Sequence, residues 1–160
     1  LEMYLPQHGT GVQKTDKFTF RSSLGTSVVY NWKITNGSSS FYEIQDCMKE
    51  FREVRPYFYE DYYPLTGLGD LTGDDVWLAY QLNKPSDGTG IVVAFRRKDN
   101  PQDSTVVKLR GLDPQQVYSV QNGNDGKIAA KTGKELADGL TLEIGEAPGS
   151  LLLKYSPAGK

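Results

Sequence analysis

The sequence is poor in the two residue types that most often hold metals or carry out nucleophilic chemistry. Its 160 residues include one cysteine, Cys47, and one histidine, His8. A single cysteine excludes a disulfide within the chain and a zinc site built from cysteines, and a single histidine excludes a site that needs two imidazoles. We therefore expect no bound metal and no cofactor.

Long apolar runs and an excess of positive charge are also lacking. No apolar run approaches the roughly 20 residues that a membrane helix needs, so we expect no membrane partner. Lys and Arg total 18 against 20 Asp and Glu, which gives a net charge of -2. A nucleic-acid-binding protein normally carries a basic face, so we expect no nucleic-acid partner. The 38% of hydrophobic residues is enough for a folded core.

The chain starts at Leu1 rather than at methionine. No charged segment followed by an apolar run marks a signal peptide. We interpret the chain as processed or truncated, and its compartment stays open.

Aromatic residues and charge are distributed unevenly. Fifteen of the 18 aromatic residues lie within residues 1–80, and the net charge changes from -4 over residues 1–75 to +2 over residues 76–160. The Gly- and Asp-rich stretch 66–75 lies at this change. We predict two regions, residues 1–65 and residues 76–160, joined by a linker at 66–75. The alternative is a single domain with a long loop at 66–75.

The first region shows the alternation of an α/β fold. Residues 26–34 are rich in β-branched and aromatic residues and predict a strand, and residues 3–5 predict the end of another. A short helix is expected within residues 15–24. Strand–loop–helix units in succession are typical of α/β proteins.

A longer amphipathic helix is predicted over residues 40–54. Ser40 and Glu43 have the spacing of a capping box, and Pro56 ends the helix. The apolar stripe consists of Phe41, Ile44, Met48, Phe51 and Val54. The polar face consists of Glu43, Asp46, Lys49, Glu50, Arg52 and Glu53. Cys47 lies beside the stripe and is expected to be packed rather than reactive.

The second region is expected to be all β. Seven short strands are predicted at residues 76–82, 90–97, 105–110, 117–120, 127–130, 140–144 and 151–155. Hairpin-type turn signals lie between several of them, as at Asp87-Gly88 and Asn122-Gly123. Short strands with regular turns and no helical stripe favour an antiparallel sandwich or barrel. Trp77 and Phe95 lie inside strands and are predicted to be core residues.

Few residues are candidates for chemistry. His8 lies in the loop 5–11 (LPQHGTG) at the end of a predicted strand, where sites form in α/β units. It is either a residue that lines a pocket or a loop histidine bonded locally. No nucleophile motif is present, so no catalytic residue is expected.

Carboxylates and aromatic residues between the two regions allow further interpretations. Asp61, Asp70, Asp74 and Asp75 could in principle supply a glycosidase pair, but aspartates in loops commonly cap turns. The aromatic run 57–63 suits either a sugar platform or packing between domains, and we favour packing.

Several segments resemble glycoside hydrolase family 36, the α-galactosidases. Those that resemble the junction after the barrel and the C-terminal β-sandwich are residues 51–58 (FREVRPYF), 61–66 (DYYPLT), 75–81 (DVWLAYQ), 90–97 (GIVVAFRR) and 111–114 (GLDP). The loop 5–11 resembles the histidine-containing loop after the seventh barrel strand, and residues 20–23 (FRSS) resemble the arginine-bearing segment that follows. The likeness extends over nearly the whole chain.

The resemblance implies a mainly β chain, with an antiparallel β-sandwich preceded by a small α/β remnant of a (β/α)8 barrel. It implies a retaining α-galactosidase as parent, with both catalytic carboxylates upstream of Leu1 and with His8 as a substrate-binding residue. The expected partner is carbohydrate, bound through the parent enzyme. A homo-oligomer through the barrel remnant is also expected.

Two other functions stay open for the chain by itself. One is a carbohydrate-binding module that uses aromatic residues of the sandwich. The other is a structural domain that covers the surface of the barrel. The sandwich region has few aromatic residues to present, and this favours the structural role.

Overall fold

The computed structural model describes residues 17–27, 41–67 and 73–159. The predicted strand end at 3–5, most of the predicted strand 26–34, His8, Ser40 and Asp70 lie outside the described residues. The chain divides into two compact units, Leu1–Tyr59 and Glu60–Lys160. Each unit is described below by itself.

The described part of the first unit is helical. It contains α1 (Lys17–Ser22), α2 (Phe41–Val54) and the 3-10 helix η2 (Arg55–Tyr59). Both α-helices lie where the sequence predicts helices. α2 ends at Val54, two residues before Pro56, and the chain continues as η2. Proline has no backbone N–H to donate to the carbonyl four residues earlier, so the α-helical hydrogen bonding stops there. The buried face of α2 includes Cys47, Phe51 and Val54.

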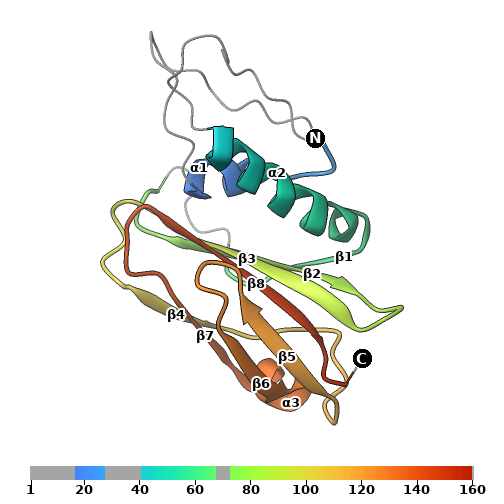
Figure 1. The fold of residues 1–160 in the computed structure, drawn as a ribbon. Helices are drawn as coiled ribbons and strands as arrows, with labels where there is room; N and C mark the ends of the chain where they lie inside the picture. The colour runs from blue at the N-terminus through green and yellow to red at the C-terminus, as the bar shows by residue number, and fades with distance from the viewer. Residues whose placement is uncertain (1–16, 28–40, 68–72, 160) are drawn as a thin grey trace, which may run out of the picture. The chain divides into compact units, whose positions relative to one another are not determined.

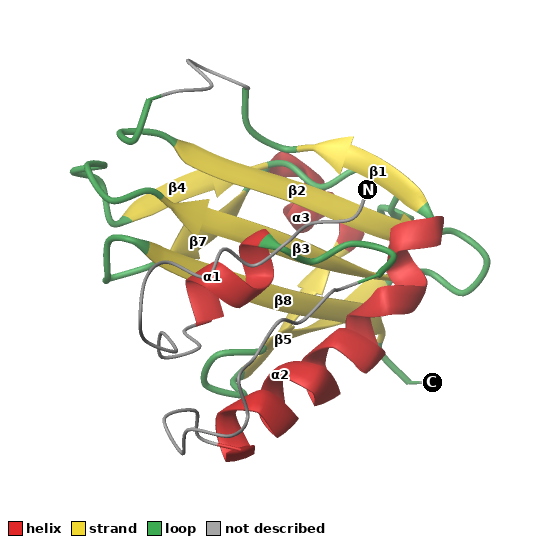
Figure 2. Ribbon diagram, turned by 90° about the horizontal axis from the view of Figure 1, so that it is seen from above, coloured by secondary structure: helices red, strands yellow, loops and turns green. Residues whose placement is uncertain are grey.

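The second unit is a β-sandwich with sheets of unequal size. The larger sheet consists, in spatial order, of β1 (Asp61–Pro64), β2 (Trp77–Lys84), β3 (Thr89–Arg96), β8 (Gly149–Pro157), β5 (Val117–Asn122) and β6 (Ile128–Thr132). The smaller sheet pairs β4 (Ser104–Val107) with β7 (Leu140–Glu143). All pairings are antiparallel. Figure 1 shows β4 and β7 as a separate layer, and Figure 2 shows β1, β2, β3 and β8 side by side.

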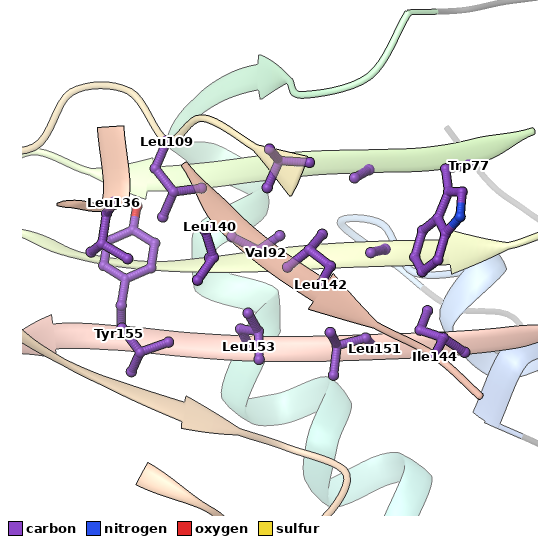
Figure 3. Close-up of a cluster of buried hydrophobic side chains, with 14 of the residues drawn as sticks. Trp77, Val92, Leu109, Leu136, Leu140, Leu142, Ile144, Leu151, Leu153 and Tyr155 are labelled. Carbon is purple, nitrogen blue, oxygen red and sulfur yellow. The ribbon is translucent and has the colours of Figure 1, made fainter. Parts of the chain in front are cut away.

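Alternating residues of these strands form the core between the two sheets. In β7, Leu140 and Leu142 are buried while Thr141 and Glu143 are exposed. This is the pattern expected of a strand with one face in the core. Figure 3 shows the buried side chains of β7 facing those of β3 and β8, among them Val92, Leu151 and Leu153. The mainly β, antiparallel architecture that the sequence predicts is confirmed, and all seven predicted strands are present.

Two elements of this unit were not predicted. β1 is formed by part of the aromatic run and pairs with β2, with Asp61 opposite Asn83 and Pro64 opposite Tyr80. α3 (Gly133–Asp138) is a helix of six residues that begins with a capping box between Thr132 and Glu135. The expectation of no helix after residue 76 was therefore wrong. A helix this short has no room for a repeating apolar stripe, so only its capping residues mark it in the sequence.

Trp77 is a core residue, as predicted, and is 7% exposed. Its indole N–H donates a hydrogen bond to the Gln102 carbonyl at 3.1 Å. Phe95 is also buried, but it alternates with Val92 and Ala94 of β3 and lies outside the core cluster. Both residues are therefore buried, as predicted, and Trp77 alone of the two belongs to the cluster between the sheets. None of the described helices has the length and apolar character needed to cross a membrane.

We expect Trp77→Ala to lower the free energy of unfolding of the sandwich by about 3–5 kcal/mol, because it removes a large side chain from the core and leaves a cavity. Urea denaturation followed by circular dichroism measures this change. Ile128→Ala is the control, since Ile128 lies in a strand of the same unit but is 66% exposed. Equal effects of the two substitutions would contradict the assignment of Trp77 to the core.

Candidate functional site

The strongest electrostatic feature of the first unit is a buried ion cluster that joins α1 to α2. The guanidinium of Arg21 donates two hydrogen bonds to the Glu50 carboxylate, from Nε at 2.7 Å and from Nη2 at 2.9 Å. Lys17 Nζ lies 3.0 Å from the same carboxylate. The Arg21 side chain is fully buried and that of Glu50 is 10% exposed. This two-point geometry is the strong form of an arginine–carboxylate pair.

Local sequence explains why these groups meet. Arg21 lies in the last turn of α1 beside the buried Phe20, and Glu50 precedes Phe51 on the buried face of α2. The apolar neighbours bring both charged groups out of water. An isolated charge would be costly there, so each group needs the other.

The ion cluster changes the acidity of Glu50. Burial raises the pKa of this carboxyl group, but the hydrogen bonds and charges of Arg21 and Lys17 outweigh burial. The pKa of Glu50 therefore lies below its ordinary value. A carboxylate held ionised by two cations is unsuited to donate a proton, since a general acid needs a raised pKa.

The prediction that Glu50 lies on the polar face of its helix was wrong. The residue is buried because Arg21, 29 residues earlier in the chain, compensates its charge. Helical periodicity cannot reveal such a partner. The one available signal was the resemblance of residues 20–23 to an arginine-bearing segment, which pointed to Arg21 but not to Glu50.

Cys47 is buried and has no disulfide partner, in agreement with the prediction that it is packed. Burial raises the pKa of its thiol, which keeps it protonated and unreactive. His8, the other residue of this unit that was considered for chemistry, lies outside the described residues.

The aspartates near the start of the sandwich are engaged in local contacts. Asp61 accepts a hydrogen bond from the Tyr63 hydroxyl at 3.3 Å. Asp74 forms ion pairs with Arg97 and with Lys98, whose Nζ lies 2.8 Å from its carboxylate. The hydrogen bond from Lys98, with the charge of Arg97, lowers the pKa of Asp74. Neither carboxylate has the environment of a glycosidase acid.

A cavity of about 280 Å³ lies at one end of the smaller sheet. It is lined by Asp103, Ser104, Glu143 and Gly145. Its lining includes two carboxylates, and the described residues contain no group of three or more His, Cys, Asp or Glu side chains that could hold an ion. The lining residues of the cavity thus do not identify a ligand or a reaction.

The described surface of the sandwich presents one large aromatic side chain. Tyr62 is 60% exposed, and its ring lies 5.7 Å from that of Tyr80, tilted by 32°. The other aromatic residues of this unit are buried or half-buried. A sugar-binding surface normally combines an exposed aromatic ring with several polar side chains that hydrogen-bond the ligand. Tyr62 alone is weak support for a binding module.

We expect Glu50→Gln to lower the free energy of unfolding at neutral pH by about 3 kcal/mol, because Arg21 would remain buried without a counter-charge. The folded-state pKa of Glu50 is lower than its ordinary value of 4.5. Its stabilising effect is therefore complete above about pH 4.5 and is lost as the pH falls through the folded-state pKa. Urea denaturation at several pH values from about 2 to 7, a range that brackets the ordinary pKa of a glutamate, measures both effects.

Asp46→Asn on the same helix is the control, since Asp46 is exposed. The acid-dependent loss of stability should be smaller in Glu50→Gln than in the parent chain and unchanged in Asp46→Asn. An unchanged acid profile in Glu50→Gln would show that the ion cluster does not contribute to stability.

Comparison with known proteins finds the same fold in larger enzymes. No protein-family model and no curated relative matches the sequence. Among solved structures, the chain is similar to the glycoside hydrolase family 36 α-galactosidase AgaA of Geobacillus stearothermophilus in complex with raffinose, with 19% identity and a TM-score of 0.69. It is also similar to the galactosidase domain of an α-galactosidase–sucrose kinase, with 20% identity and a TM-score of 0.66.

A third similar structure is the α-galactosidase from Lactobacillus brevis, with 15% identity, a TM-score of 0.66 and 89% of this chain covered. The match to the first two structures covers 98% of this chain but 21% of each of theirs. The chain thus spans about a fifth of the length of these enzymes. The resemblance seen in the sequence is confirmed at the level of the fold: the chain has the architecture of one part of the family 36 α-galactosidases.

Proposed function

We propose that the chain is the C-terminal part of a retaining α-galactosidase and that it supports the catalytic barrel without carrying the catalytic carboxylates. The observation that carries this proposal is the fold match over 98% of the chain to α-galactosidases that are about five times longer. The sequence resemblance supports the C-terminal position and the barrel remnant in residues 1–65. It also supports a substrate-binding role for His8.

The state of the described side chains agrees with a supporting role. Glu50 and Asp74 are held by cations, and Asp61 accepts a hydrogen bond from a tyrosine. Hydrolysis with retention needs a nucleophilic carboxylate and a protonated acid about 5 Å apart across the scissile bond. Glu50, Asp61 and Asp74 are each engaged in local contacts of a different kind. Carbohydrate would therefore reach the protein through the parent enzyme.

We expect the 160-residue chain to show no turnover of an aryl α-galactoside. The assay needs a full-length family 36 enzyme as positive control, so that inactivity of the chain is not a failure of the substrate. Asp61→Asn and Asp70→Asn should behave like the parent chain. Turnover that either substitution abolishes would contradict the supporting role.

The alternative, a carbohydrate-binding module, has one favourable observation, the exposed ring of Tyr62. Titration with raffinose followed by calorimetry separates the two functions. The supporting role predicts no measurable heat in the parent chain or in Tyr62→Ala. Saturable binding that is lost in Tyr62→Ala would favour the module.

We also propose that copies of the chain associate through residues 1–60. The support is the incomplete barrel that the sequence resemblance implies, because strand edges without their neighbours invite pairing. The described stripe residues Phe51 and Val54 of α2 are already buried within one chain, so they add no support. Sedimentation of the full chain should show association, while residues 60–160, which include every strand of the sandwich, should sediment as a monomer. A monomeric full chain at high concentration would contradict this proposal.

A further inference from the structure

A row of polar side chains crosses the apolar core at one end of the sandwich. Asn83 of β2 and Tyr155 of β8 both lie opposite Gly90, which belongs to the strand between them. Gly90 has no side chain, and a Cβ atom there would lie 2.1 Å from the Tyr155 hydroxyl oxygen. The glycine thus lets the Tyr155 ring pass over β3 toward β2. Gln81, Asn83 and Tyr155 are at most 2% exposed.

These side chains form a continuous chain of hydrogen bonds with a fixed direction. The backbone N–H of Arg110 donates to Gln81 Oε1 at 2.9 Å, which fixes the orientation of the Gln81 amide. Gln81 Nε2 donates to the Arg110 carbonyl and to the Tyr155 hydroxyl, both at 2.8 Å. The Tyr155 hydroxyl then donates to Asn83 Oδ1 at 2.8 Å. Each group accepts a hydrogen bond from the group before it and donates to the group after it. The last acceptor is Asn83 Oδ1, so the last donor is the Asn83 amide nitrogen, Nδ2.

The end of the chain is a donor without a protein acceptor. Asn83 Nδ2 is buried, and no described residue lies within hydrogen-bonding distance of it with suitable geometry. A buried amide donor left unpaired is costly, and native proteins satisfy almost all such groups with protein atoms or an ordered water molecule. Asn83 Nδ2 is therefore expected to have a partner that is not part of the protein.

The neighbourhood of Asn83 Nδ2 suits a small polar partner. A Cβ atom at Gly111 would lie 2.9 Å from Asn83 Nδ2 and 3.3 Å from the Tyr63 hydroxyl oxygen. Gly111 has a φ of +71°, which other residues rarely adopt. Glycine at this turn thus lets the chain approach a donor of β2 and a hydroxyl of β1 without a Cβ atom that would crowd them.

We propose that Asn83 Nδ2, the Tyr63 hydroxyl and the turn at Gly111 form a binding site for one buried water molecule. The water accepts a hydrogen bond from Asn83 Nδ2 and donates one to the Tyr63 hydroxyl oxygen. Two to four polar partners are what a buried water needs. The bound water completes the chain that starts at Arg110 and ties the edge strand β1 to β2 and to the loop between β4 and β5.

A crystal structure of the 160-residue chain at about 1.5 Å tests the site directly. We expect one ordered water within about 3.0 Å of Asn83 Nδ2 and of the Tyr63 oxygen. Either of two findings would overturn the proposal. One is a direct hydrogen bond from the Asn83 amide to a protein acceptor. The other is a flipped amide whose Oδ1 accepts from the Tyr63 hydroxyl, with no water between them.

A pair of glycine substitutions tests the energetic role of the site. Gly111→Ala places a methyl group beside Asn83 Nδ2 and should displace the water. Gly126→Ala is the matched control, because Gly126 has a φ of +76° but no atom within 4 Å of the added Cβ. Both variants have similar backbone strain, so the melting temperature of Gly111→Ala should be lower than that of Gly126→Ala by at least about 3 °C.

Equal melting temperatures of the two variants would overturn the energetic role of the water. If Gly111→Ala does not fold, the contact of the added Cβ with Asn83 explains the loss without a water, and the crystal structures of the parent chain and of Tyr63→Phe decide. Tyr63→Phe provides a second variant, which keeps the ring but removes the hydroxyl. Its structure should show the water with reduced occupancy.

Discussion

The sandwich depends on the pairing of β3 with a neighbour on each side. β3 pairs with β2 over eight residues and with β8 over seven, and six of its eight residues are buried. Backbone groups buried in this way must be paired, and the two ladders satisfy them. Alternate residues of β3 then face β7, so the same strand that completes the hydrogen bonding also supplies one wall of the core.

The first unit is stabilised by a different interaction. Its described helices are joined by Arg21 and Glu50, which are buried together and would each be costly alone. Such a pair specifies one arrangement of α1 against α2, because both hydrogen bonds require the planar groups to face each other. Lys17 adds a third charge at the partly exposed edge of the cluster.

The functional proposal rests on fold and on the condition of the carboxylates. Fold similarity by itself does not establish an activity, because one architecture can carry different sites. What the described residues add is chemical: Glu50 and Asp74 are held by cations, Asp61 accepts a local hydrogen bond, and the cysteine is buried. The buried polar row of Gln81, Asn83 and Tyr155 likewise joins β2 to β8 and to the backbone of Arg110.

The sequence by itself determined seven of the eight described strands, β2 to β8, and the helix α2, because these depend on periodic patterns of neighbouring residues. Alternation in residues 140–144 and the stripe that ends at Val54 are local signals of this kind. The resemblance to family 36 also came from short local segments whose order matched.

Only the tertiary structure decided which polar residues are buried. Glu50 has the spacing of a surface residue, yet Arg21 draws it into the interior. Gln81 and Asn83 lie within a strand whose pattern shows no partner, and their partners come from residues 110 and 155. β1 likewise forms a strand because its backbone pairs with that of β2, which lies 13 or more residues later in the chain. Burial of a polar group depends on a partner brought close by folding, and no local pattern in the sequence encodes that distance.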